Sequence, residues 1–212
     1  MRQRRIKNRD SIIAECGACL IEDPAACRGR WNEVFARTAP LILEIGSGKG
    51  QFITRMAQLF PDRDFIACEG QFNVYPRILQ KVTELGLSNV KVIGGYIDDP
   101  QEFFTEGEIS GIYLNFSDPW KERTKHRRLT SRKKLEGYRK ICAHGAFLQF
   151  KTDNDELFAY SLEELSAAGL EPSVVEYDLH SSPLVDSNIM TEYEEKFTNE
   201  GIKIKYFCTY FT

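Results

Sequence analysis

From about residue 40 onward, short apolar runs alternate regularly with helical segments along this chain. Apolar runs of ~4–8 residues are typical of buried parallel strands, and apolar side chains three or four positions apart are typical of amphipathic helices. Parallel neighbours need a crossover helix between them, so the alternation predicts an α/β fold with a doubly wound, mostly parallel seven-stranded sheet. The expected strands are residues 41–45, 65–68, 90–93, 111–116, 146–152, 173–178 and 203–211.

The chain is predicted to contain one large domain preceded by an arm. Residues 39–212 carry all the expected strands, whereas residues 1–38 show little periodicity and are expected to form a basic N-terminal arm or leading helix. No apolar run approaches the ~20 residues that span a bilayer. Residues 1–9 also lack the apolar core of a signal peptide, so we expect a cytoplasmic protein. Whether it is a monomer or a homodimer stays open.

Positive charge is concentrated in two segments, although the net charge is −3. Residues 2–9 contain five basic residues and no acid, and residues 121–134 contain eight basic residues and one acid. Such patches attract phosphate groups, while the acidic remainder of the chain discourages indiscriminate binding. RNA is therefore a candidate partner, and a solvated helix face or a disordered arm is the alternative.

The six cysteines raise the question of a metal site. Cys16 and Cys19 have the spacing of half a zinc site, and Cys27 is a third candidate ligand. However, no second Cys-x-x-Cys exists and the three histidines are scattered. We therefore predict neither a metal site nor structural disulfides.

A glycine-rich loop, Gly46-Ser-Gly-Lys-Gly50, follows the first expected strand. Ligands of doubly wound sheets bind beyond the carboxyl ends of the strands, and glycines let backbone amides approach a ligand closely. A P-loop is excluded, because Leu43 stands where its first glycine is required. A dinucleotide fingerprint matches only in part, because Gln51 stands where its third small residue is required.

S-adenosylmethionine suits this loop better than a pyrophosphate does. Glu44 lies two residues before the first glycine, where a carboxylate repels a pyrophosphate but attracts the ammonium and sulfonium groups of this cofactor. Glu69, at the end of the second strand, can accept hydrogen bonds from both ribose hydroxyls. The alternative is a structural glycine turn beside a surface glutamate.

The fourth expected strand ends in Ser117-Asp-Pro-Trp120, directly before the second basic segment. Pro119 fixes the turn and Trp120 offers a surface on which a base can stack. Asp118 can accept hydrogen bonds from N1–H and N2–H of guanine. The alternative is a buried tryptophan anchor next to an aspartate that caps a helix.

Four segments together are similar to the bacterial tRNA (guanine-N7)-methyltransferase family, and the resemblance extends from about Trp31 onward. It implies the Rossmann-like fold of S-adenosylmethionine-dependent methyltransferases, with tRNA as the partner and no membrane. It also implies methyl transfer to N7 of a guanosine in the variable loop. The segments are residues 43–50 (Leu-Glu-Ile-Gly-Ser-Gly-Lys-Gly), 117–129 (Ser-Asp-Pro-Trp through His-Arg-Arg-Leu), 150–153 (Phe-Lys-Thr-Asp) and 188–197.

The resemblance, with the residue chemistry above, implies roles for individual side chains. Asp118 is expected to be catalytic. The cofactor is expected to contact Glu44, Gly46, Gly48, Gly50, Glu69, Tyr96 and Asp118. The tRNA is expected to contact Lys121, Asp153, Thr191, Glu192, Tyr193 and Glu194, together with Arg127 and Arg128 of the basic segment.

Two departures from the family pattern bear on the site. The family carries Asp-Pro-Trp-Pro before its basic run, whereas here Lys121 follows Trp120 directly. The family also has an acid near the adenine, at the end of the third strand, where this chain has Tyr96. Either Tyr96 stacks on the adenine, or Asp98 takes the place of the acid.

Two alternative functions stay open. Methyltransferases of exocyclic base nitrogens use an Asn/Asp-Pro-Pro-aromatic turn, from which residues 117–120 differ by one proline. A non-catalytic RNA-binding protein that keeps the fold would account for Tyr96 and the shortened basic segment. A nicotinamide enzyme explains least, because its chemistry has no use for that segment.

Overall fold

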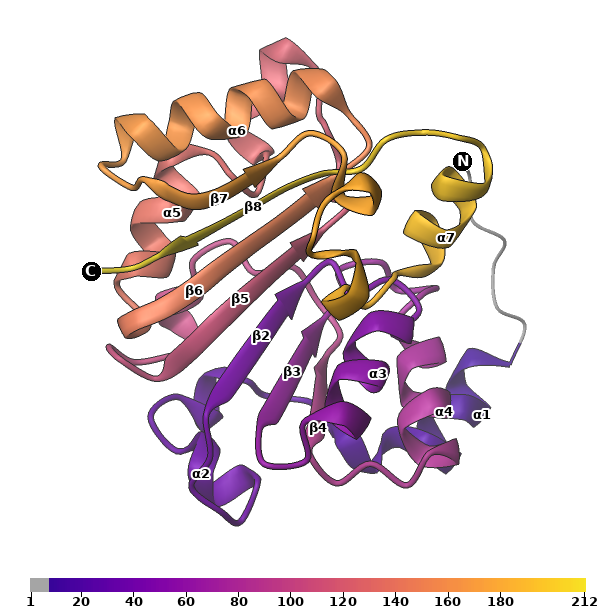
Figure 1. The fold of residues 1–212 in the computed structure, drawn as a ribbon. Helices are drawn as coiled ribbons and strands as arrows, with labels where there is room; N and C mark the ends of the chain where they lie inside the picture. The colour runs from indigo at the N-terminus through magenta and orange to yellow at the C-terminus, as the bar shows by residue number, and fades with distance from the viewer. Residues whose placement is uncertain (1–7) are drawn as a thin grey trace.

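Eight strands form a single sheet in the computed structural model, which describes residues 8–212 (Figure 1). The elements that carry the site come from the whole length of the chain. In chain order they are α1 (Arg9–Cys16), β1 (Leu20–Ile21), α2 (Trp31–Val34), β2 (Leu41–Ile45), α3 (Gln51–Leu59), β3 (Asp64–Cys68), α4 (Pro76–Glu84), β4 (Val90–Ile93), β5 (Ile109–Asn115), α5 (Arg132–Arg139), β6 (Cys142–Thr152), α6 (Asp155–Ala167), β7 (Pro172–Glu176), α7 (Glu192–Asn199) and β8 (Lys205–Tyr210).

The strand order is β1-β4-β3-β2-β5-β6-β8-β7, and β8 alone among the described strands runs in the direction opposite to the others. The predicted doubly wound, mostly parallel sheet is therefore confirmed, with one correction to the number of strands. The eighth strand is β1, whose Leu20 and Ile21 pair with Val92 and Ile93 of β4. Two residues are too few to show any hydrophobic period, so this strand could not be predicted from the pattern of apolar residues.

The N-terminal part of the chain packs against the sheet domain from α1 onward. Helix α1 contacts α4, and the Trp31 side chain is 2% exposed, with its indole N–H donating to the carbonyl of Phe103. These contacts cross the boundary expected at residue 38. Of the first basic segment, Arg2, Arg4, Arg5 and Lys7 lie outside the described residues, while Arg9 lies over the ring of Phe72.

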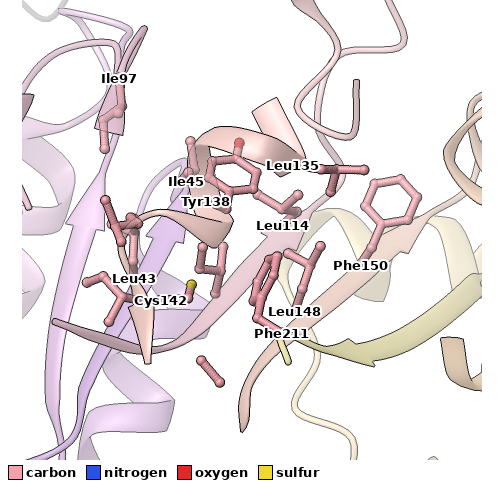
Figure 2. Packing of buried hydrophobic residues seen from close by; sticks show 14 of the residues in the cluster. Leu43, Ile45, Ile97, Leu114, Leu135, Tyr138, Cys142, Leu148, Phe150 and Phe211 are labelled. Atoms are coloured by element: carbon pink, nitrogen blue, oxygen red, sulfur yellow. The ribbon is translucent and has the colours of Figure 1, made fainter. Parts of the chain in front are cut away.

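Helices cover both faces of the sheet (Figure 1). On one face α3 and α4 pack with α1 beside them, and on the other face α5 and α6 pack against β5 and β6. Figure 2 shows the second layer, in which Leu114 and Leu148 of the sheet meet Leu135 and Tyr138 of α5. The carboxyl ends of the parallel strands meet at one edge of the sheet, between the two helical layers.

The helices and the cysteines of the described chain bear on whether it has a membrane span or a metal site. None of the helices within residues 8–212 combines the length and apolar character needed to cross a membrane. All six cysteines are free thiols, and no cluster of three or more metal-ligating side chains occurs in the same range.

Candidate functional site

The glycine loop turns sharply at the carboxyl end of β2. Gly46 and Gly48 have φ angles of +84° and +56°, a region that side chains other than glycine rarely adopt. The amides of Gly46 and Ser47 both donate to the carbonyl of Cys68, at 2.8 and 3.0 Å, which anchors the loop to the end of β3. A Cβ atom at Gly46 or Gly48 would meet nothing within 4 Å, so bare backbone faces open space.

Glu44 is a buried carboxylate beside this loop. Its side chain is 1% exposed and accepts a hydrogen bond from Asn115 Nδ2 at 2.8 Å through Oε1. The second oxygen, Oε2, is also buried and has no partner among the described residues. Burial raises the pKa of Glu44 to about 7, and the hydrogen bond from Asn115 opposes that shift. A buried acceptor without a partner is costly, and a cationic donor would satisfy this one.

Glu69 lies next to the loop at the end of β3. Its oxygens accept hydrogen bonds from the amides of Gly48 (2.8 Å) and Gln71 (2.7 Å). Burial raises the pKa of Glu69, and the negative charge of Asp118 contributes in the same direction. The charge of Glu69 in turn contributes to the raised pKa of Glu44. The three carboxylates predicted from separate strand ends therefore lie in one electrostatic neighbourhood.

Tyr96 lies flat against the backbone that follows Glu69. A Cβ atom at Gly70 would stand 2.2 Å from the ring of Tyr96, so only glycine leaves room for it there. The tyrosine is 70% exposed and offers its ring to the solvent. Asp98, the other candidate, is fully exposed and points toward the ammonium of Lys134, 3.9 Å away. The aromatic ring is thus better placed beside Glu69 than the carboxylate.

The turn after β5 is held in an unusual backbone conformation. Phe116 and Trp120 have φ angles of +52° and +35°, which cost free energy for residues other than glycine. The Asp118 side chain is exposed, and it makes no hydrogen bond or ion pair within residues 8–212. The guanidinium of Arg127 stacks on the Trp120 ring at 3.9 Å from its centroid. The turn therefore presents a free carboxylate beside an indole.

Arg128 holds this turn in place, which corrects its expected role. The side chain is 2% exposed and donates to the carbonyls of Pro119 (2.6 Å) and Trp120 (3.0 Å). It also pairs with Glu156 at 3.1 Å. The phosphate contact expected for Arg128 does not fit this placement, because the guanidinium is enclosed by protein. Lys121 and Arg127 are exposed, as a phosphate contact requires.

The expected contacts of residues 191–194 divide into two kinds. Thr191 and Glu194 form a capping box at the start of α7, and the Glu194 side chain is 0% exposed. Glu192 pairs with Lys49 at 3.1 Å and with Lys81 at 2.8 Å. These residues attach α7 to the loop and to α4. Tyr193 alone of the four is exposed.

Tyr193 lies beside the β5 turn. Its ring stacks on Phe116 with centroids 6.5 Å apart, and it is 50% exposed. Asp153, at the end of β6, is half-buried, and its carbonyl accepts a hydrogen bond from Lys205. Since β5 and β6 are paired, the ends of these two strands lie side by side. Asp118, Tyr193 and Asp153 therefore surround the same end of the sheet.

Two buried residues at the site were missed in the sequence. Asn115 and Lys151 lie in predicted segments, but neither is among the predicted site residues. No helix is predicted between the strands expected at residues 173–178 and 203–211, where the structure has α7. The pattern Thr191-x-x-Glu194 is a capping box and is the one local signal that could have predicted this helix.

Known proteins with similar sequences are tRNA modification enzymes. Residues 38–207 match a family model described as "Putative methyltransferase". The tRNA (guanine-N(7)-)-methyltransferase of Geobacillus kaustophilus is 49% identical over 193 residues, which are 91% of this chain and 88% of the relative. Proteins of the same name from Latilactobacillus sakei and Bacillus subtilis are 45% and 43% identical, over 93% and 95% of this chain and 94% of each relative.

Solved structures with this fold are methyltransferases as well. The 16S rRNA methyltransferase KamB superposes with a TM-score of 0.64 at 13% identity, over 86% of this chain and 92% of its own. A SAM-dependent methyltransferase from Aquifex aeolicus gives a TM-score of 0.58 at 13% identity, over 96% and 98% of the two chains. At such low identity these similarities concern the fold alone.

Proposed function

This chain belongs to the tRNA (guanine-N7)-methyltransferase family, and we propose that it transfers the methyl group of S-adenosylmethionine to N7 of a guanosine in the variable loop of tRNA. One observation carries the proposal. Glu44 holds a buried oxygen without a partner next to the open glycine loop, and Glu69 and Asp118 lie in the same neighbourhood. A tRNA substrate also accords with the cytoplasmic location expected from the sequence.

The residues present fit the methyl donor. Glu44 Oε2 would accept a hydrogen bond from the ammonium group in the methionine part of the donor. The open backbone at Gly46 and Gly48 would lie against the carboxylate of the same part. Glu69 would exchange its bond to the Gly48 amide for the ribose hydroxyls. Bound in this way, the donor supplies an electrophilic methyl group on a positively charged sulfur.

The chemistry of guanine N7 makes no demand for a general base. N7 has an in-plane lone pair and no proton to lose. The new N–C bond forms as the S–C bond breaks, and the positive charge moves from sulfur to the purine. The protein therefore has to orient the reactants, which can contribute roughly 7–11 kcal/mol in well-aligned systems. Asp118 would accept hydrogen bonds from N1–H and N2–H, which turns the opposite edge, with N7, toward the methyl group.

The decisive experiment maps the methylated atom. The protein is incubated with unmodified tRNA and labelled donor, and the RNA is then cleaved chemically at N7-methylguanosine. We expect one cleavage, within the variable loop. Label in an N2-methylated or another exocyclic nucleoside, found by mass spectrometry, would identify the other class of methyltransferase. Absence of both label and donor binding would identify a non-catalytic RNA-binding protein.

Lys121 and Arg127 are proposed to bind tRNA phosphates. Both are exposed beside the Asp118 turn, and neither has an ion-pair partner within the described residues. Each alanine variant is expected to weaken tRNA binding and to lower the slope of log K against log salt by about 1. Lys140→Ala is the matched control, because this exposed lysine precedes β6 at the opposite end of the sheet. An unchanged slope in Lys121→Ala and Arg127→Ala would refute the assignment.

Tyr96 is proposed to stack on the adenine. A base on an aromatic ring contributes about 1–3 kcal/mol, so Tyr96→Ala should weaken S-adenosylhomocysteine binding roughly tenfold, while Tyr96→Phe should keep it. Gly70→Ala should have the same effect as Tyr96→Ala, because the added methyl displaces the ring. The double variant should then be no worse than either single variant. Calorimetric titration measures all four, and wild-type affinity in Tyr96→Ala would contradict the proposal.

A further inference from the structure

Lys151 is a buried lysine that has no role in the proposed chemistry. It lies in β6 between Asn115 of β5 and Tyr206 of β8, and its side chain is 5% exposed. Its ammonium lies on the α3 side of the sheet, 5.1 Å from the Phe52 ring. Burial lowers the pKa of Lys151, and the negative charges of Glu194 and Glu44 oppose that shift. A charge in such a place persists only when it is paired and fully hydrogen-bonded.

All three hydrogens of this ammonium are donated to one remote stretch of chain. The acceptors are Asn188 Oδ1 at 3.0 Å, the carbonyl of Ile189 at 2.8 Å and Glu194 Oε2 at 2.7 Å. They belong to the α7 segment, by which we mean residues 188–199. Because an ammonium has three donors, the bonding capacity of Lys151 is exhausted by this segment.

The carboxylate of Glu194 is equally saturated. Besides Lys151 it accepts hydrogen bonds from Asn188 Nδ2 and from the amide of Thr191, and His180 Nε2 lies 3.1 Å away. The buried ion pair therefore lies at the centre of a closed polar network. Removal of one partner would leave the other charge buried and uncompensated, which is far costlier than the loss of an exposed ion pair.

The network controls where the α7 segment lies. The segment's other ion pairs to the body of the domain include the partly exposed pairs of Glu192 with Lys49 and Lys81 and of Glu195 with Arg55. Exposed pairs of this kind contribute little. Lys151 is thus the one attachment of the segment, among the described ion pairs, in which both charges are almost fully buried. Figure 1 shows α7 beyond the carboxyl ends of the central strands.

We propose that Lys151 is a positioning residue for methyl transfer: its ammonium fastens the α7 segment to the end of β6 and thereby fixes Tyr193 beside the Asp118 turn. This proposal rests on the proposed function. It states that a buried charge, which touches no substrate, determines the position of the part of the site that faces the substrate. Glu194 acts through the same pair, so its role is structural within the site rather than one of direct tRNA contact.

Lys151→Met tests this directly. Without the ammonium the ordered segment becomes a minor conformation, so kcat/KM for tRNA should fall about 30-fold. Amide hydrogen exchange in residues 188–199 should accelerate, while the amides of β2 and β5 stay protected. Exchange is measured without substrate, so it remains informative even if the wild-type protein methylates no tRNA. Asn188→Ala, which removes one acceptor, should change both readouts in the same direction and less strongly.

Two further variants separate positioning from general stability. Lys151→Met combined with Glu194→Gln removes the uncompensated charge without restoring the ammonium, so its activity and protection should stay about as low as in Lys151→Met alone, and full recovery would contradict the proposal. Arg37→Met breaks a half-buried ion pair, that of the exposed Arg37 with the buried Asp64 at the opposite end of the sheet, and should lower the melting temperature without accelerating exchange in residues 188–199. The proposal is overturned if Lys151→Met leaves exchange in these residues unchanged, or if Arg37→Met accelerates it equally.

Discussion

Replacing Asp118 with alanine is expected to lower kcat for methyl transfer to tRNA by roughly 10²–10³-fold, the size of effect seen when one preorganised polar contact to a reacting group is lost. The side chain is exposed and free of internal partners, so its removal leaves the fold intact. What is lost is the acceptor for N1–H and N2–H of guanine. The purine can then rotate, and N7 is no longer held in line with the sulfur–carbon bond.

Single-turnover transfer of labelled methyl groups to unmodified tRNA measures this effect. Asp62→Ala is the control, since Asp62 is an exposed acid just before the amino end of β3, at the end of the sheet opposite to Asp118. Asp118→Asn, which keeps one acceptor oxygen, should retain intermediate activity. Wild-type turnover in a folded Asp118→Ala protein would remove this residue from the mechanism.

The second large effect is expected for Glu44→Gln, which should weaken S-adenosylhomocysteine binding by about 100-fold, because a buried charge-assisted hydrogen bond is lost. In the wild type the ammonium needs the ionised carboxylate, whose pKa is raised by burial to about 7 in the free protein. Binding should therefore strengthen about tenfold from pH 6 to pH 8. The pKa of Glu69 is also raised, which adds to the trend in the same direction. Glu44→Gln should flatten this dependence, and calorimetry at several pH values measures it.

The same carboxylate affects the stability of the free protein with the opposite sign. Because the pKa of Glu44 is raised from 4.5 to about 7 on folding, the folded state holds a proton that the unfolded chain releases between those values. The stabilisation is present at low pH and is lost as the pH rises through about 7. Glu44→Gln should therefore raise the melting temperature of the ligand-free protein at pH 8. A melting temperature that falls instead would contradict the burial of an ionised Glu44.

The central part of the site could be predicted because it follows from local rules. Glu44, Glu69 and Asp118 each lie at or just beyond the end of an apolar run, and β3, β2 and β5 are neighbours in the sheet. The carboxyl ends of adjacent parallel strands meet at one edge, so residues at these positions converge whatever the details of the loops. The order of small, acidic and aromatic residues along the chain was therefore sufficient to predict that these three acids lie close together.

The periphery of the site could not be predicted in the same way. Arg128 belongs to a basic run and is expected to bind phosphate, yet its side chain is buried beneath the turn after β5, whereas its neighbour Arg127 is exposed. From sequence alone a charged residue is expected to be exposed to solvent, unless a buried partner for it is known. Two of its three partners are the backbone carbonyls of Pro119 and Trp120, and a carbonyl leaves no trace in the pattern of side chains.

Hydrophobic periodicity and strand ends are local properties, so the fold class and the sheet edge at which the acids of the candidate site gather can be read from the order of residues. Packing in three dimensions was needed to show that β1 joins the sheet, that Tyr96 fills the space above Gly70, and that Lys151 meets Glu194. These are contacts between residues far apart in the chain. Their free energy depends on burial and on a partner's exact position, which only the folded chain defines.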